Sequence, residues 1–144
     1  MSTGVFRFWG TLLLIYSLLV LSPPHSGHGV SSAVEFARSA IARGHQIQRA
    51  FFLDDGVYSG SSKSVFPQDE SNPAAPWAEL AQEHSVELIL CVSSALKRGL
   101  LDETEADRYD LPGATVHPAF TISGLGQLID ACDSSDRMLT FGGH

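Results

Sequence analysis

The chain has 144 residues, a length that suits one domain with a substantial buried core. Its hydrophobic content of 44% and its charged content of 17% are typical of a globular protein and not of a disordered one. The formal net charge of -7, with only nine lysines and arginines, argues against a large nucleic-acid footprint, because phosphate binding depends on basic side chains.

The apolar segment near the start of the chain has three interpretations. Behind Arg7, the run from Leu12 to Leu21 has the outline of a signal peptide, but no A-x-A cleavage site follows it. The run is also shorter than the roughly 20 apolar residues that a membrane-spanning helix needs. We favour a first buried strand over about Leu14–Leu21, because a turn-rich loop and an amphipathic helix follow it, and this unit repeats later in the chain.

Alternating strands and helices are predicted along the rest of the chain. The first helix begins at Ser31 or Ser32, with Glu35 completing a capping box, and it ends at Arg43 before the C-cap residue Gly44. The further predicted elements are a strand at Ile47–Leu53, a loose loop at Ser59–Pro76, a helix from Pro76 to about Glu83, a strand at Val86–Cys91 with a short helix behind it, an acidic helix at Asp102–Asp107 capped by Asp102, a short strand within Val116–Ile122, a helix within Ser123–Cys132 and a last strand at Arg137–Phe141.

This order of elements predicts the fold class. Strands that alternate with helices are joined by right-handed crossovers, which give a mostly parallel sheet covered on both faces. We therefore expect a single α/β domain with about five strands over residues 14–144. Residues 1–13 are then an N-terminal extension, or they reflect a start codon set too early.

Cys91 is the candidate reactive residue. It follows the apolar run Val86–Leu90, a predicted buried strand, and precedes a short helix that Gly99 ends. Ligands gather at the carboxyl ends of parallel strands, and the positive end of a helix dipole favours thiolate over thiol. The hydroxyls of Ser93 and Ser94, with free backbone N–H groups, can stabilise such an anion. A small buried hydrophobe without a chemical role is the alternative, because free cysteine is commonly that.

The remaining candidates point to no second chemistry. Cys132 lies in an apolar helix and is interpreted as structural and unbridged, with a resolving thiol as the alternative. His25 and His28 lie in a loop at the ligand-facing edge, but no further residues are spaced to complete a metal site. Neither a P-loop nor a G-x-G-x-x-G fingerprint is present, so nucleotide binding has little support. We expect neither a metal nor an organic cofactor.

Several segments resemble the DsrE/TusD family of sulfurtransferase subunits, and its TusD branch most closely. The resemblance runs from about Ile15 to Phe141 and rests on Ser31–His45, Phe51–Tyr58, Cys91–Gly99 with the acidic segment Asp102–Ala106, and Phe120–Gly126. It implies a cytosolic, three-layer α/β/α fold in which Cys91 carries a persulfide without any cofactor. Backbone N–H groups near Ser93 and the loop around Tyr58 are then expected to stabilise the persulfide anion.

The same resemblance implies partners. Two smaller related subunits, TusB-like and TusC-like, are expected to join the chain in a heterohexamer. A TusA-like donor would supply sulfur and a TusE-like acceptor would take it, for 2-thiolation of the wobble uridine of tRNA. The chain itself is expected to contact neither nucleic acid nor membrane. Three alternatives stay open: a DsrE-type role in dissimilatory sulfur oxidation, a non-catalytic assembly subunit, and an exported or membrane-attached binding protein.

Overall fold

The computed structural model describes residues 6–8 and 11–142. Within them lies a five-stranded sheet, here called the main sheet, with the order β6-β5-β4-β3-β7 and parallel pairing throughout. Its strands are β3 (Ile15–Val20), β4 (Gln46–Phe52), β5 (Glu87–Cys91), β6 (Thr121–Ser123) and β7 (Arg137–Phe141). The helices are α1 (Gly29–Ala42), the 3-10 helix η1 (Asp54–Gly60), α2 (Ala74–His84), α3 (Val92–Leu96), α4 (Glu103–Arg108) and α5 (Gly126–Ser134).

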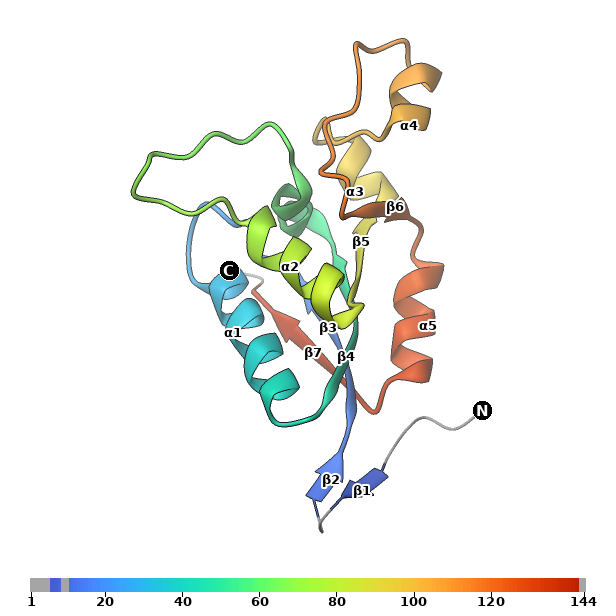
Figure 1. The fold of residues 1–144 in the computed structure, drawn as a ribbon. Helices are drawn as coiled ribbons and strands as arrows, with labels where there is room; N and C mark the ends of the chain where they lie inside the picture. Colours follow the sequence, from blue (N-terminus) through green and yellow to red (C-terminus); the bar gives the residue numbers. More distant parts are fainter. Residues whose placement is uncertain (1–5, 9–10, 143–144) are drawn as a thin grey trace.

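The helices form a layer on each side of the main sheet. Helices α1 and α2 lie against one face and α5 lies against the other (Figure 1). The predicted three-layer α/β/α fold with about five parallel strands is therefore confirmed. Helix α3, η1 and the loops after the strands gather at the carboxyl edge of the main sheet, where the candidate cysteine was expected.

Two core clusters follow from the alternation of side chains along the strands. The larger one fills the space under α1 and α2, and its largest buried members are Trp77, Phe52, Leu18, Ile47 and Leu90. The smaller one lies on the α5 side and consists of Phe51, Ile89 and Cys91, with half-buried Leu19, Leu53 and Leu128 packed against it. Strand β5 and the second half of β4 are thus buried on both faces, as their apolar runs Leu88–Cys91 and Ala50–Phe52 predict.

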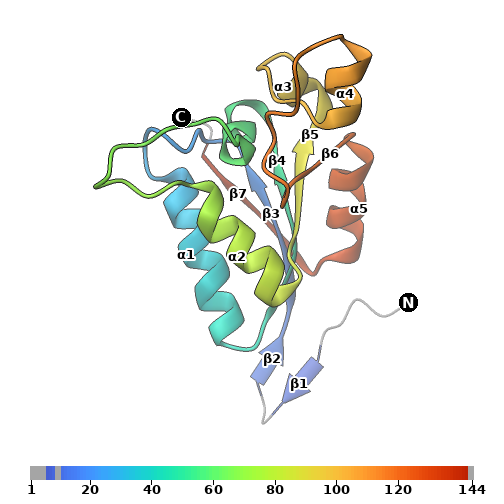
Figure 2. The ribbon, with the colours of Figure 1, turned by 45° about the horizontal axis from the view of Figure 1, so that its top comes forward.

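The segment before β3 contains two short strands of its own. Strand β1 (Phe6–Phe8) pairs antiparallel with β2 (Thr11–Leu13), and the pair lies beyond the amino end of β3, apart from the main sheet (Figure 2). The favoured interpretation of the apolar run as a first strand is confirmed by β3, whereas no element was expected in residues 1–13. Among the described residues, no helix is both long and apolar enough to cross a membrane.

The predicted starts of α3 and α4 are confirmed, whereas those of α1 and α2 are wrong. Asp102 caps α4, since its carboxylate accepts a hydrogen bond from the Glu105 N–H at 2.8 Å. The capping box proposed for α1 is wrong, because α1 begins earlier, at Gly29, where burial of Val30 adds apolar contact. Helix α2 likewise begins at Ala74 and not at Pro76, with the side chain of Asn72 accepting from the Ala74 N–H at 2.9 Å.

The strand predicted within Val116–Ile122 is shorter than expected. Strand β6 covers Thr121–Ser123, while Val116 makes only an isolated bridge with Ser61. Pro118 lies between them and has no backbone N–H to donate to a ladder. The break places Ser123 beside Cys91 in the register of β5 and β6.

Candidate functional site

Cys91 occupies the junction that the sequence predicts. It is the last residue of β5 and the N-cap of α3, with an extended backbone conformation (φ -60°, ψ 125°). The strand ends there because the chain turns into helix at Val92. The thiol therefore lies at the carboxyl edge of the main sheet, beside the unpaired N–H groups that begin any helix.

Two serines in the first turn of α3 act on the thiol. The Cys91 Sγ lies 3.5 Å from the Ser93 Oγ. Burial by itself raises the pKa of the Cys91 thiol, but hydrogen bonds from the Ser93 hydroxyl, and from the backbone N–H and hydroxyl of Ser94, favour the anion and outweigh it. The net pKa lies below the ordinary cysteine value. The structure thus brings Ser93 and Ser94 to the sulfur, which as a thiolate is a nucleophile.

The thiol is covered in the single chain. Cys91 is only 2% exposed, and Phe51, Ile89 and the α5 residue Leu128 pack in the same cluster. The thiol is therefore not directly reachable in the chain on its own. Access to the sulfur requires either movement of the residues above it or a change of cover when partners bind.

Tyr58 lies away from the cluster that contains the thiol. Its ring meets the ring of His25 edge-on at a centroid distance of 5.7 Å, and it packs against the larger core cluster, whereas Cys91 belongs to the smaller one. The same helix η1 reaches the site through a different residue, because the Asp54 N–H donates to the Ser94 Oγ at 3.0 Å. Tyr58 is therefore connected with the stabilisation of the thiol only indirectly, because it lies in the same helix η1 as Asp54.

Cys132 is exposed, so its interpretation as a buried structural residue is wrong. Helix α5 buries Ala131 against the sheet and turns the next residue outward, where Cys132 borders a shallow surface depression with Ile129 and Asp133. The two cysteines are both free. The helix that the sequence predicts here is present as α5. Because α5 packs on the sheet with one side only, its other side, which includes Cys132, faces solvent.

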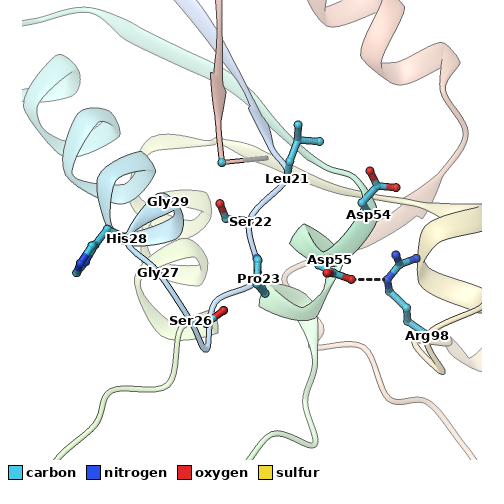
Figure 3. A pocket seen from close by; sticks show the side chains of 11 residues that line it. Leu21, Ser22, Pro23, Ser26, Gly27, His28, Gly29, Asp54, Asp55 and Arg98 are labelled. Atoms are coloured by element: carbon cyan, nitrogen blue, oxygen red, sulfur yellow. Dashed lines mark hydrogen bonds and ion pairs between the residues drawn. The ribbon is translucent and has the colours of Figure 1, made fainter. Parts of the chain in front are cut away.

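A cavity of about 780 Å³ lies beside the candidate site at the same edge of the main sheet (Figure 3). It is lined by residues of the loop after β3, the start of α1, η1 and the segment after α3, among them Ser22, His28, Asp54, Asp55 and Arg98. Among the described residues that line this cavity, Cys91 is not present. In that same part, no cluster of three His, Cys, Asp or Glu residues could hold a metal ion.

Arg98 is the functional candidate that the sequence missed. Its Nε donates to the Asp55 Oδ1 at 3.0 Å, and its Nη1 donates to the Ser94 carbonyl oxygen at 3.1 Å. Asp55 and Arg98 are 43 residues apart, so no local pattern pairs them. The one available signal was their common position, since each closely follows a parallel strand and therefore lies at the same edge.

The fold and the site define a class of protein. It has an α/β/α fold and a free cysteine with a lowered pKa at the point where a parallel strand is followed by a helix. The profile of the DsrE/DsrF-like family matches residues 15–141, and the chain belongs to this family. The family resemblance expected from the sequence is thereby confirmed.

Named relatives match nearly the whole chain. A sulfurtransferase TusD homolog of Pseudomonas aeruginosa is 41% identical over 128 residues, covering 89% of this chain and 97% of the relative. Sulfurtransferase TusD of Serratia proteamaculans is 40% identical over 129 residues, covering 90% and 100%. A protein of Allochromatium vinosum, provisionally named sulfurtransferase DsrE, is 39% identical over 127 residues, covering 88% and 98%. These names support a sulfurtransferase subunit.

Among solved structures, the ychN protein of E. coli superimposes with a TM-score of 0.67. The alignment covers 90% of this chain and 100% of ychN, at 17% sequence identity. At this identity the likeness concerns the fold alone, which agrees with the three layers described above.

Proposed function

We propose that the chain is a sulfurtransferase subunit that holds sulfur as a persulfide on Cys91 and passes it from a donor protein to an acceptor protein. The observation that carries this proposal is the free thiol at the β5–α3 junction, whose pKa the first turn of α3 lowers. The sulfurtransferase names of the relatives from Pseudomonas and Serratia support the same class of activity.

The proposed chemistry is a pair of thiol exchanges. The Cys91 thiolate attacks the outer sulfur of the donor persulfide, a new S–S bond forms, and the old S–S bond breaks as the donor thiolate leaves. An acceptor thiolate then attacks the outer sulfur on Cys91, and the Cys91 thiolate leaves in turn. Neither step changes the total oxidation level, so neither needs an oxidant or a reductant. The Ser93 hydroxyl and the Ser94 N–H stabilise the anion at both stages.

The proposed setting is a cytoplasmic sulfur relay. TusB-like and TusC-like subunits would form a heterohexamer with this chain, a TusA-like protein would deliver sulfur, and a TusE-like protein would receive it for 2-thiolation of the tRNA wobble uridine. The relatives named TusD support this branch. The net charge of -7 fits a chain that meets proteins and not the tRNA itself. A covered thiol also fits transfer inside an assembly.

Two other roles each have an observation in their favour. The 39% identity to the Allochromatium protein favours a DsrE-type role in dissimilatory sulfur oxidation, with the same chemistry and different partners. The burial of Cys91 favours a non-catalytic assembly subunit in which the cysteine is only packing.

The test is to load the chain, purified with its co-expressed partner subunits, from a persulfide donor. We expect the intact mass to rise by about 32 Da, one sulfur atom, as persulfidation of a thiolate requires. Cys91→Ser should remove this increase and Cys132→Ser should keep it. An adduct that survives in Cys91→Ser would overturn the assignment. Normal assembly and undiminished sulfur flux in Cys91→Ser would establish the assembly subunit instead.

A further inference from the structure

The helix that follows Cys91 is too short to hold its own position. Helix α3 has five residues, and an isolated helix of this length is not stable, because its nucleation is unfavourable. Its first turn nevertheless supplies the hydrogen bonds of Ser93 and Ser94 to the thiol. Contacts from outside α3 therefore decide whether these donors stay directed at the sulfur.

Ser94 is held from two sides. The Asp54 N–H donates to the Ser94 Oγ at 3.0 Å, and the Arg98 Nη1 donates to the Ser94 carbonyl oxygen at 3.1 Å. The Arg98 Nε also donates to the Asp55 Oδ1 at 3.0 Å, so Arg98 ties the end of α3 to the start of η1 (Figure 3). Asp54 itself has a left-handed backbone (φ 51°), which a residue other than glycine keeps where its surroundings hold it.

We propose that Arg98 and Asp55 are a positioning pair that holds Ser94, and with it the first turn of α3, against the thiol of Cys91. The pair acts through the Ser94 carbonyl oxygen, which Arg98 joins to Asp55 of η1, while the Asp54 N–H holds the Ser94 hydroxyl. The side chain of Arg98 is only 21% exposed, and it reaches its two partners with two different nitrogens of one planar group, Nε and Nη1, whereas a lysine offers a single nitrogen. This inference rests on the proposed function, because it concerns the thiol that would carry sulfur.

Arg98 could affect the pKa of Cys91 in two ways, by its own charge or by holding α3 in position, and the structure distinguishes them. The residues of β3, β4, β5 and α5 that form or border the core cluster containing Cys91 are apolar. Charged side chains on the surrounding elements are Arg49 on β4, Glu87 on β5, Asp54 and Asp55 on η1, Lys97 and Arg98 after α3, and Asp130 and Asp133 on α5. The lowered pKa of Cys91 comes from hydrogen bonds of Ser93 and Ser94 and not from any of these charges. A change at Arg98 that reaches the thiol must therefore act by moving α3.

The experiment measures the pKa of Cys91 from the ultraviolet absorption of its thiolate against pH, in the full chain carrying Cys132→Ser. This signal needs no reagent to reach the buried sulfur. We expect Arg98→Gln and Arg98→Lys each to raise the pKa by about 0.5 to 1 unit, roughly the value of one net hydrogen bond. Asp55→Asn should raise it less, since an amide oxygen still accepts. Arg38→Gln, which removes an exposed ion pair with Glu79, is the matched control and should change nothing.

Three results would overturn the inference. The first is an unchanged pKa in Arg98→Gln, and the second is a wild-type pKa in Arg98→Lys, which would mean that charge alone matters. The third is a pKa shift in the double variant, Arg98→Gln with Asp55→Asn, that equals the sum of the two single shifts. If the two residues act as one pair, removing the second after the first should add little. Should Arg98→Gln fail to fold, an unchanged pKa in Asp55→Ala, which leaves no acceptor for Arg98, decides against the pair. Sulfur uptake on wild-type Cys91 is measured separately, so failure of the proposed function is distinguishable.

Discussion

At the scale of single residues, the reactivity of Cys91 depends on a balance of two opposing effects. Burial disfavours the charged thiolate, while hydrogen bonds from Ser93 and Ser94 favour it and prevail. Lys97 and Arg98 do not contribute directly, as their distance along the helix predicts. Small changes in these few hydrogen bonds should therefore have measurable effects on the sulfur.

Ser93→Ala tests the hydroxyl closest to the thiol. We expect the pKa of Cys91 to rise by about 0.5 to 1 unit, because a net hydrogen bond to the anion is lost while burial stays. The thiolate absorption titration in the Cys132→Ser chain measures it. Ser31→Ala, an exposed hydroxyl on α1 that donates to the His28 carbonyl, is the control. An unchanged pKa in Ser93→Ala would show that the hydroxyl does not act on the sulfur.

The lowered pKa also makes stability depend on pH. A thiol whose pKa is lower in the native state than in the unfolded chain binds fewer protons when folded. The free energy of unfolding should thus rise with pH from the lowered native pKa up to about 8.5, the unfolded value, and lose this contribution as the pH falls. Urea denaturation at a series of pH values should show the rise in the wild-type chain and its absence in Cys91→Ser. Parallel curves for the two chains would refute it.

At the scale of elements, α5 covers the thiol and is itself fastened to the sheet. Leu128 packs against the cluster that holds Cys91. One turn away, the buried Arg49 of β4 donates to Glu87, to Asp130 and to the Gln127 carbonyl oxygen, which joins β4, β5 and α5. The helix on the thiol's side of the sheet is therefore fastened by this guanidinium, together with hydrogen bonds between Gln48 and Ser134 and the burial of Ala131.

Leu128→Ala should uncover the thiol. We expect alkylation of Cys91 in the Cys132→Ser chain to become severalfold faster, because truncation opens space over the sulfur. The labelling rate, followed by intact mass, is the measurement. Leu125→Ala removes an exposed leucine before α5 and should leave the rate unchanged. Equal rates in the wild type and Leu128→Ala would mean that reagents enter by another route.

Arg49→Met should weaken the attachment of α5. We expect a loss of about 1 to 2 kcal/mol in the free energy of unfolding, since the Gln127 carbonyl loses its donor while both carboxylates are more than half exposed and screened. Urea denaturation measures it. Arg38→Gln breaks an exposed pair and should cost about 0.5 kcal/mol or less. A stability equal to that of the wild type would remove Arg49 from this role.

How much the sequence predicts depends on the range of the interaction. The β5–α3 junction, the Asp102 cap and the left-handed Gly44 and Gly99 follow from local patterns, and the structure has them. The contacts that hold the site are remote: Asp54 is 40 residues from Ser94, and Arg49 is 81 residues from Asp130. For the same reason the sequence indicated a structural Cys132 in an apolar helix, whereas the placement of α5 leaves Cys132 exposed and Cys91 buried.

At the scale of the whole molecule, the two faces of the main sheet are covered unequally. Helices α1 and α2 lie over one face, while α5 lies over the face that contains Cys91 (Figure 1). Leu125 and Ile129 are exposed, so apolar surface lies on α5 and at its start, on the same face of the sheet as Cys91. A relay subunit would need its sulfur protected until a partner arrives, and this arrangement is compatible with that order of events.

The proposed function requires that Cys91, and no other residue, carries the sulfur. The most direct measurement is to load the assembled complex from a persulfide donor, trap it with an alkylating reagent and map the extra sulfur after trypsin digestion. Cleavage after Lys63 and Lys97 isolates Cys91 on one peptide, and cleavage after Arg108 and Arg137 isolates Cys132 on another. We expect the extra sulfur only on the peptide that contains Cys91. Sulfur on the Cys132 peptide, or on neither, would contradict it.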